Sequence, residues 1–215
     1  MAFNRGFDST QTKSRRLLIE AAEALLEEEG QYAISARRIA ERAGIKPQLV
    51  HYYFRTMDDL LVAVFNSAAD QYLELHEAAL DSAQPLHAIW QLNSHMPRTR
   101  RNMAFIALGT QHPGLRAEMQ RSGEMFRAMQ IEAVERVLRE RGQAPDPILA
   151  PSLAMLMAAI ARTTAMETQI GITLAHDEIS RMVEAVLDRL EPGPAADQPD
   201  ADANPPLGDG QHEVS

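Results

Sequence analysis

Apolar residues recur along most of this chain at intervals of three and four residues, the spacing that places them on one face of an α-helix. From Thr12 to Glu29 they form a single apolar face, and Gly30 follows where a helix would end. Segments in which apolar and polar residues alternate, as they do in half-buried β-strands, are absent from the sequence. The pattern therefore predicts an all-α protein.

Two short helices joined by a turn are predicted next. Ser35 suits the N-cap of a helix that runs to Ala43, because its hydroxyl can accept a hydrogen bond from an amide of the first turn. Gly44 fits the left-handed conformation that ends many helices. Pro47 fits the first turn of the next helix, where its missing N–H has no partner to lose, and this helix should end near residues 53–54. Such a pair is typical of a helix-turn-helix, although an αα-hairpin has the same spacing.

Prolines and glycines divide the rest of the chain into six longer helical segments. We expect helices at residues 58–80, 85–93, 97–109, 113–142, 151–171 and 177–190. Residues 191–215 differ in composition, since they contain five prolines, six acidic residues and no lysine or arginine. This segment has too few apolar residues to offset the entropy cost of ordering, so we predict a disordered tail.

The net charge of −9 is distributed unevenly along the chain. Residues 1–57 contain nine Lys or Arg residues and seven acidic residues, whereas the remainder contains 12 basic and 23 acidic residues. Such asymmetry suggests an electrostatic division of labour between the two parts. A run of solvated charges would give the same numbers, so the charge alone does not define a function.

Motifs for catalysis, metals and cofactors are missing from the sequence. It contains no cysteine, which excludes disulfides, zinc–thiolate sites and thiol catalysis and fits a reducing compartment. None of the patterns G-x-S-x-G, H-E-x-x-H, G-x-G-x-x-G or the P-loop occurs. We therefore expect neither enzymatic activity nor a bound cofactor or metal.

Two further patterns bear on the location of the protein. No run of about 18 uninterrupted apolar residues exists, so no membrane-spanning helix is expected. The N-terminal residues lack the apolar segment of a secretory signal. We expect a cytoplasmic protein without membrane contact.

Tyr52 and Tyr53 stand next to His51 at the end of a helix of barely two turns. A buried position there would favour Leu or Ile, and a solvent-exposed one would favour Lys or Glu. Tyrosines suit a third environment, the wall of a DNA groove, because their hydroxyls donate to phosphates while their rings cover the sugars. The second short helix is therefore predicted to enter the major groove of DNA, which is wide enough for one helix.

Three segments, LLIEAAEALLEEEG, SARRIAERAGIKPQLVHYYF and DDLLVAV, carry alanines, a glycine, an aromatic cluster and a leucine pair at characteristic spacing. In these residues the chain resembles the tetracycline-repressor (TetR) family of bacterial transcriptional regulators, over residues 12–64. The resemblance implies an all-helical homodimer, with three N-terminal helices for double-stranded DNA and a larger part that holds a ligand cavity and the dimer interface. The expected regions are residues 1–11 (flexible N-terminal arm), 12–56 (helix-turn-helix DNA-binding domain), 57–190 (ligand-binding and dimerisation domain) and 191–215 (acidic tail).

The resemblance also implies which residues contact DNA. Gln48 is the best equipped to read a base edge, for example that of adenine. His51 stands where the family usually has tyrosine, and it could instead pack at the surface of the domain. Met57 replaces a usual lysine, and Arg55 is the expected substitute. Arg37 and Arg38 could also be plain solvated surface. The expected contacts are Lys13, Arg15, Arg16, Ser35, Arg37, Arg38, Lys46, Pro47, Gln48, Leu49, His51, Tyr52, Tyr53 and Arg55.

Methionines are unusually frequent between residues 60 and 175, where their flexible side chains suit the lining of an irregular apolar cavity. We therefore expect a small, largely apolar effector of unknown identity, although a Met-rich helical core would have the same composition. The expected cavity walls are Trp90, Met103, Phe105, Phe126, Met129 and Met166. The candidates for a polar handle are His95, Arg98, Arg101, His112 and Gln169.

The last two predicted helices are amphipathic and adjacent in sequence. Two copies would form a four-helix bundle about a two-fold axis. Four alanines would allow close approach of the helices: Ala158, Ala159, Ala161 and Ala165. Alternatively, these helices only complete the core of one protomer.

Together these expectations favour a ligand-responsive transcriptional regulator, most often a repressor in the family it resembles, that binds a pseudo-palindromic operator as a homodimer. A small molecule in the C-terminal core would tilt the helix that begins near residue 58 and lower the affinity for DNA. The alternative is a helical small-molecule carrier or protein-interaction module without operator binding. A steep dependence of DNA affinity on salt would favour the regulator.

Overall fold

The computed structural model describes residues 5–94, 96–144 and 146–192, and the side chains within 12–94, 100–144 and 146–192. In these ranges the chain forms nine α-helices, one 3₁₀ helix and no strand, which confirms the prediction of an all-α protein. The elements are α1 (Arg5–Glu28), η1 (Gln31–Ala33), α2 (Ala36–Ala43), α3 (Gln48–Tyr53), α4 (Met57–Leu80), α5 (Pro85–Ser94), α6 (Met96–Gly109), α7 (Pro113–Glu140), α8 (Leu149–Gln169) and α9 (His176–Leu190).

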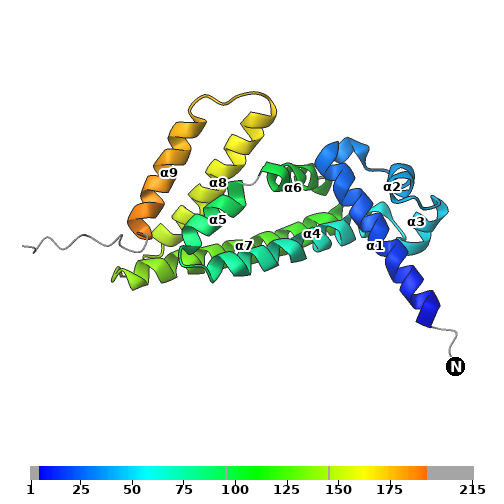
Figure 1. Ribbon diagram of the computed structural model, residues 1–215, viewed down its shortest axis with the longest axis horizontal. Coiled ribbons are helices and arrows are strands. Elements are labelled where there is room, and N and C mark those ends of the chain that lie inside the picture. The colour runs from blue at the N-terminus through cyan, green and yellow to red at the C-terminus, as the bar shows by residue number, and fades with distance from the viewer. Residues whose placement is uncertain (1–4, 95, 145, 193–215) are drawn as a thin grey trace, which may run out of the picture.

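The molecule is elongated, with α1–α3 at one end and α8–α9 at the other (Figure 1). The long helices α4 and α7 lie side by side and connect the two ends. α5 packs against α4 and α8, while α6 lies against α1, α7 and α8. This arrangement leaves the two short helices α2 and α3 at one tip of the molecule.

The helices begin and end close to the predicted positions, but the start of α1 differs. α1 begins at Arg5 instead of Thr12, so residues 5–11 are helical rather than a flexible arm. No proline interrupts this segment, and its single glycine weakens the helix by about 1 kcal/mol without ending it. The 3₁₀ turn η1 is not indicated by the hydrophobic pattern, because three residues are too few to show a period. Residues 1–4 of the expected arm lie outside the described residues.

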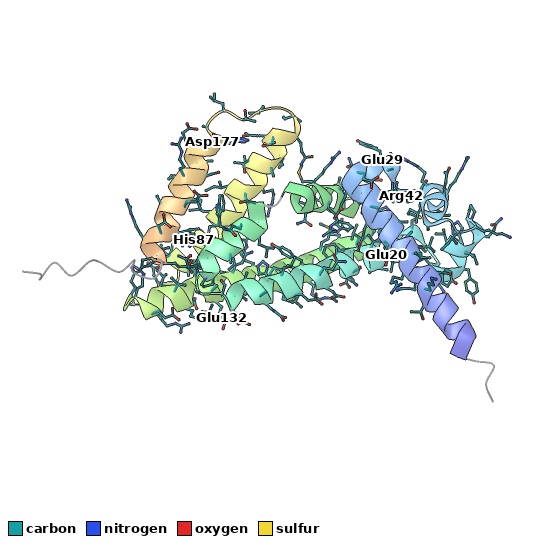
Figure 2. All side chains as sticks on the ribbon, viewed as in Figure 1. Glu20, Glu29, Arg42, His87, Glu132 and Asp177 are labelled. Atoms are coloured by element: carbon teal, nitrogen blue, oxygen red, sulfur yellow. The ribbon has the colours of Figure 1, made fainter. Side chains whose placement is uncertain are left out.

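Glu191, the first residue of the predicted tail, is part of the folded structure. Its side chain is buried, and its carboxylate accepts hydrogen bonds from the backbone amides of Leu86 (2.8 Å) and His87 (3.1 Å). These amides lie in the first turn of α5, where helix geometry leaves N–H groups unpaired and favours a negative charge. His87 itself lies beside α9, at the end of the molecule away from α1–α3 (Figure 2). Residues 193–215 lie outside the described residues.

The N-terminal core joins the short helices to one end of the long ones. Buried side chains of α1, α2 and α3 meet Leu60, Leu61 and Val64 of α4. Phe105 of α6 and Leu115 of α7 belong to the same core. The packing therefore continues across the expected boundary between residues 56 and 57, and the short helices share one core with α6 and α7.

A second core joins α5, α7, α8 and α9. Its largest buried side chains include Leu86, Trp90 and Leu187. α8 contributes three buried alanines and Met157 to this core, so its inward face is made of mostly small side chains. Small side chains let helices approach closely, which explains how α8 packs against both α5 and α7.

By length and composition alone, α8 is long and apolar enough to cross a membrane. An 18-residue stretch of it has a mean hydropathy of 1.3, and 33% of that stretch is buried. The sequence predicts no such helix because it contains no uninterrupted apolar run of about 18 residues. Arg162 interrupts the apolar sequence of α8, but the mean hydropathy of the helix stays high. A core helix of a soluble protein meets the same criteria, and α8 packs against four neighbouring helices, α5, α6, α7 and α9.

Candidate DNA-binding surface and interior crevices

Local hydrogen bonds build the helix-turn-helix from α2 and α3. The Ser35 hydroxyl accepts a hydrogen bond from the amide of Arg38 (3.3 Å) and so caps the start of α2. Gly44 ends α2 with a φ of 65°, a left-handed conformation that costs glycine little. Its amide donates to the carbonyl of Ala40. Pro47 then precedes α3 with a φ of −55°, as the ring requires.

α3 presents most of its side chains to solvent. Only Val50 is buried, at 1% exposure, and it anchors the helix to the N-terminal core. Tyr53 is half-buried, and its ring meets that of Tyr52 edge-on at 5.1 Å between centroids. Four neighbouring side chains are exposed: Gln48, Leu49, His51 and Tyr52, the last at 63%. The outward face of α3 therefore offers an amide, an imidazole and a phenol, all of which can form hydrogen bonds with DNA.

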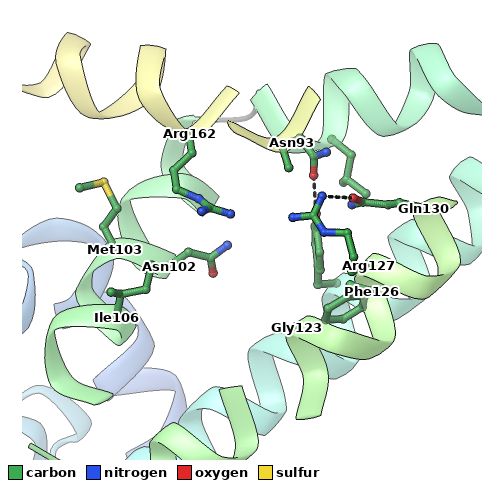
Figure 3. Close-up of a pocket in the computed structure, with 12 residues that line it drawn as sticks. Asn93, Asn102, Met103, Ile106, Gly123, Phe126, Arg127, Gln130 and Arg162 are labelled. Atoms are coloured by element: carbon green, nitrogen blue, oxygen red, sulfur yellow. Dashed lines mark hydrogen bonds between the residues drawn. The ribbon is translucent and has the colours of Figure 1, made fainter. Parts of the chain in front are cut away.

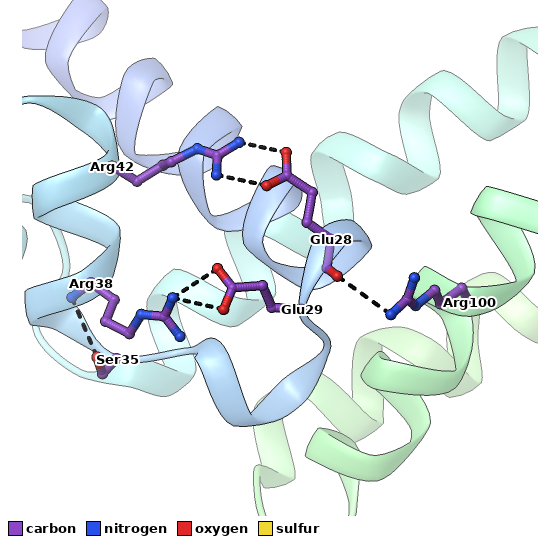
Figure 4. Close-up of polar contacts among 6 residues, drawn as sticks. All are labelled: Glu28, Glu29, Ser35, Arg38, Arg42 and Arg100. Atoms are coloured by element: carbon purple, nitrogen blue, oxygen red, sulfur yellow. Dashed lines mark hydrogen bonds and ion pairs between the residues drawn. The ribbon is translucent and has the colours of Figure 1, made fainter. Parts of the chain in front are cut away.

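Two arginines of α2 are held by acidic residues at the end of α1 (Figure 4). Arg38 pairs with Glu29 at 2.7 Å, and Arg42 donates to Glu28 at 2.7 Å. Hydrogen bonding to Arg42 lowers the pKa of the Glu28 carboxyl, and the same contact raises the pKa of Arg42. Arg38 therefore already has an internal partner, so a phosphate contact by Arg38 would compete with Glu29.

Other predicted DNA contacts remain exposed. Arg37, Lys46 and Arg55 form no ion pair within the described part of the chain. On α1, Arg16 pairs with Glu20 at 3.3 Å, while the Arg15 guanidinium lies 5.1 Å from the centre of the Phe54 ring. Exposed Lys13 lies on the same helix, and Pro47 is exposed at the start of α3. The tip of the molecule thus brings the predicted contacts of α2 and α3 together, with those of α1 nearby.

Polar contacts missed by the sequence reading tie α1 to α6. Arg101 of α6 pairs with Glu27 of α1 at 2.8 Å, and its side chain is only 10% exposed. Arg100 donates to the backbone carbonyl of Glu28 at 3.3 Å (Figure 4). Burial raises the pKa of Glu23, which lies one turn before Glu27. Charge partners so far apart in sequence leave no local signal, because the pairing follows from the fold.

A second link joins the start of α4 to the start of α7. Thr56 caps α4 in a reciprocal arrangement with Asp59, with both hydrogen bonds at 3.0 Å. Asp58 instead reaches α7, where it accepts hydrogen bonds from the amides of Gly114 (3.0 Å) and Leu115 (3.3 Å). A side chain at residue 114 has no room, because an added Cβ would lie 2.6 Å from Asp58 Oδ2.

Two adjoining crevices open between α4, α6, α7 and α8, and α5 also contributes to the first of them. The first crevice has a volume of about 190 Å³ and carries two arginines, Arg127 of α7 and Arg162 of α8, on its walls (Figure 3). The second crevice has a volume of about 280 Å³ and lies nearer the N-terminal core. Six residues line both crevices: Tyr72, Asn102, Ile106, Gly123, Phe126 and Arg162.

The expected cavity walls are distributed unevenly over these crevices. Met103 lines the first crevice, Phe105 the second, and Phe126 both. Trp90 is instead buried in the second core, and Met166 is 45% exposed on α8. Met129 is half-buried on α7 outside both linings.

The expected polar handles are also divided between different places. Arg101 lines the second crevice, but its guanidinium pairs with Glu27. His112 lies near Asp58 at 3.7 Å, and Gln169 donates to Met103 Sδ at 3.5 Å. The side chains of the other two candidates, His95 and Arg98, lie outside the described residues. Arg127 and Arg162 take the position that these residues were expected to hold.

α8 and α9 expose several large apolar side chains among charged and polar ones. Exposed large side chains on the two helices include Met155, Leu156, Met166, Met182 and Val186. The alanines expected to allow close approach of a second copy do not all face outward, because Ala161 and Ala165 are buried at 2% within the protomer. Ala158 and Ala159 are half-buried. Residues 161 and 165 therefore serve the packing of one protomer, and the larger side chains form its outer surface.

Comparison with known proteins identifies similar sequences for the N-terminal part of the chain. Residues 18–64 match the sequence profile of the family described as bacterial regulatory proteins, tetR family. A curated relative, the HTH-type transcriptional regulator BetI of Rhizobium meliloti (strain 1021), is 32% identical over 69 residues. This match covers 32% of the present chain and 34% of the relative, so it spans about a third of the relative's length.

Solved structures share the fold over most of the chain. A proposed transcriptional regulator from Pseudomonas aeruginosa PAO1 superposes with a TM-score of 0.65 at 22% identity, covering 83% of this chain and 90% of that one. A proposed TetR-family regulator from Rhodococcus sp. gives a TM-score of 0.67 at 16% identity, with coverages of 83% and 99%. At such low identity these similarities establish the fold alone.

The fold is that of an all-α protein with an exposed N-terminal helix-turn-helix followed by a larger helical region. Residues 18–64 match the tetR family of bacterial regulatory proteins, in agreement with the resemblance seen in residues 12–64. The family is one of DNA-binding transcriptional regulators, and the matching part of the chain contains α2 and α3.

Proposed function

We propose that this protein is a cytoplasmic transcriptional repressor that binds a pseudo-palindromic operator as a homodimer and is released by a small molecule. The observation that carries this proposal is the exposed face of α3, which has one buried anchor, Val50, and hydrogen-bonding side chains on the outside.

The roles of the α3 residues in DNA binding follow from their chemistry. Gln48, at the start of the helix, can both donate to and accept from an adenine edge in the major groove. Tyr52 is suited to donate its hydroxyl to a phosphate and to cover the sugar with its ring. Arg37 and Lys46 supply positive charge beside the helix without an internal ion pair in the described residues. Arg38 becomes a weaker candidate because Glu29 already neutralises it.

The exposed apolar side chains of α8 and α9 support the homodimer. Among them, Met155, Leu156 and Met182 would be removed from water if two copies packed α8 and α9 into a four-helix bundle. Burial of apolar surface is the main driving force for such an association. A two-fold dimer would present two α3 helices at its ends, as a palindromic operator requires.

The links between the crevices and the helix-turn-helix suggest how a small molecule could release DNA. α6 and α7 form walls of both crevices. α6 is tied to α1 by the Arg101–Glu27 pair, and the start of α7 is tied to α4 by Asp58. A ligand that prefers one arrangement of α6 and α7 would therefore shift the position of the DNA-binding head.

The experiment that tests this proposal is selection of bound duplexes from random DNA, followed by titration at several salt concentrations. A regulator should enrich a palindromic sequence, and its affinity should fall steeply as salt rises. The alternative function, a small-molecule carrier, is favoured by the acidic composition of residues 58–215, which hold 23 acidic and 12 basic residues. A carrier would enrich no sequence at any salt concentration.

A further inference from the structure

Two positive charges face the first crevice without an acidic partner. Arg127 Nη1 donates to the carbonyl of Ala154 at 2.7 Å and lies 3.5 Å from Gln130 Oε1. Arg162 forms no hydrogen bond or ion pair within the described part of the chain. No aspartate or glutamate occurs among the described lining residues of either crevice. In a chain with a net charge of −9, this is a local concentration of uncompensated positive charge.

The rest of the first crevice is polar but neutral. Asn93, Asn102 and Gln130 line it, and Tyr72 donates its hydroxyl to the side-chain oxygen of Asn93 at 2.8 Å. Burial, and then repulsion by the neighbouring Arg162 charge, lowers the pKa of Arg127. Figure 3 shows the two guanidinium groups pointing toward one another across the crevice, so a ligand group between them would face both. A guanidinium is also well matched in geometry to a carboxylate.

The second crevice adds an apolar space beside this charge. Phe65, Phe105, Met119 and Phe126 line it, and Phe126 also lines the first crevice. The two spaces share six lining residues, so one molecule can occupy both. A positively charged, polar space next to an aromatic one is suited to a ligand that has an anionic group at one end and an apolar body at the other.

We infer that the effector is an amphipathic organic anion, with a carboxylate held between Arg127 and Arg162 and an apolar body against Phe105 and Phe126. This inference rests on the proposed function only in calling the ligand an effector, since the binding site itself needs no DNA. It revises the sequence expectation of a largely apolar molecule. The helix α8 reaches the ligand through Arg162, and α7 reaches it through Arg127.

Calorimetric titration of the full chain with matched acids and amides tests the inference. The probes are 2-naphthoate with 2-naphthamide, and decanoate with decanamide, so that each pair differs only in the anionic group. We expect each acid to bind at least about tenfold more tightly than its amide, because hydrogen bonds to charged groups are the stronger ones. Equal affinities, or no binding by any of the four probes, would overturn the inference.

Variants of Arg162 test whether the arginines of the first crevice cause the preference for the acid over the amide. Arg162→Gln removes a charge that no described residue pairs with, so the fold should be unaffected while the preference for the acid falls below about threefold. Arg162→Lys should restore part of it. The matched control is Arg139→Gln, an exposed arginine of α7 outside both crevices. An equal loss in Arg139→Gln and Arg162→Gln would assign the effect to net charge and refute the site.

Failure of this inference and failure of the proposed function give different results. The titrations contain no DNA, and operator binding is measured separately with the selected duplex. A chain that prefers the acids but enriches no duplex keeps the anion site and loses the regulatory function. A chain that binds an operator but shows no preference for the acids remains a regulator with a different ligand.

Discussion

The tip formed by α2 and α3 and the end formed by α8 and α9 differ in the side chains that they expose. At the tip formed by α2 and α3, apolar residues such as Val50 and Phe54 are buried, while Tyr52 and the polar residues around it face solvent. On α8 and α9 several large apolar side chains are exposed, for example Leu156 at 57% and Met182 at 52%, and α9 also exposes charged residues. The first surface is suited to a hydrated, charged partner, and the second to another apolar surface. The contrast therefore indicates a different kind of binding partner for each surface.

The largest effect expected from a single substitution concerns the core beneath the first surface. Phe54 is 3% exposed, so Phe54→Ala should lower the free energy of unfolding by about 3–5 kcal/mol. Tyr52→Ala, two positions away but exposed, should change it by less than about 1 kcal/mol. Urea denaturation compares the two. Similar losses in both variants would mean that the exposed face of α3 serves stability, and the contrast between the two ends would fail.

The apolar surface at the other end can be tested with a charge. Leu156→Asp places a carboxylate in the proposed dimer interface and should weaken the dimer by at least about 3 kcal/mol, because a buried charge without a partner is costly. Sedimentation velocity should show monomers where the original chain forms dimers. Gln143→Asp, an exposed position after α7, is the matched control and should leave the dimer intact. A dimer that survives Leu156→Asp would contradict this interface.

Gly114→Ala tests the contact between Asp58 of α4 and the start of α7. The added Cβ would lie 2.6 Å from Asp58 Oδ2, so the contact between α4 and α7 must shift, at a cost of about 1–3 kcal/mol in the free energy of unfolding. We expect a matching change in DNA affinity. Gly123→Ala on the same helix meets nothing within 4 Å and should stabilise the protein slightly. Thermal unfolding that ranks the two variants in the opposite order would argue against the Asp58 link.

The smallest effect concerns the buried carboxyl group of Glu23. Burial raises its pKa above the ordinary value of 4.5, so the folded state binds this proton more tightly than the unfolded state. The stability from this group is fully present below 4.5 and is lost as the pH rises through the raised pKa. Glu23→Gln should therefore flatten the pH dependence of the free energy of unfolding in that range. An unchanged pH profile, measured by urea denaturation, would contradict the assignment.

The helix-turn-helix of α2 and α3 could be predicted from the sequence because its structural features are local. The cap at Ser35, the turn at Gly44, the buried Val50 and the exposed Tyr52 all occur within residues 35–54, and each depends on residues a few positions away. Only the ion pairs of Arg38 and Arg42 with α1 escaped notice, because their partners lie nine and 14 residues earlier. Helix boundaries were predicted for the same reason, since prolines and glycines act on the residues next to them.

The crevices were less predictable because five helices contribute to them. Periodicity shows which side chains point inward but not which ones border empty space, so Trp90 was expected in the cavity and is instead packed in the second core. Arg127 and Arg162 were missed because an arginine on a helix usually belongs to its solvated face. One signal was present: Arg162 is the only charged residue between positions 148 and 166.

The central claim is that the exposed face of α3 reads DNA, and the affinity of Gln48→Ala for the selected duplex tests it most directly. At fixed salt concentration this variant should lose about 1–3 kcal/mol of binding free energy and tolerate base changes at one position of each half-site. Tyr52→Phe should weaken binding to all sequences alike, and Arg139→Gln should change nothing. If Gln48→Ala and Tyr52→Phe both bind the selected duplex as tightly as the original chain does, α3 does not contact DNA as proposed.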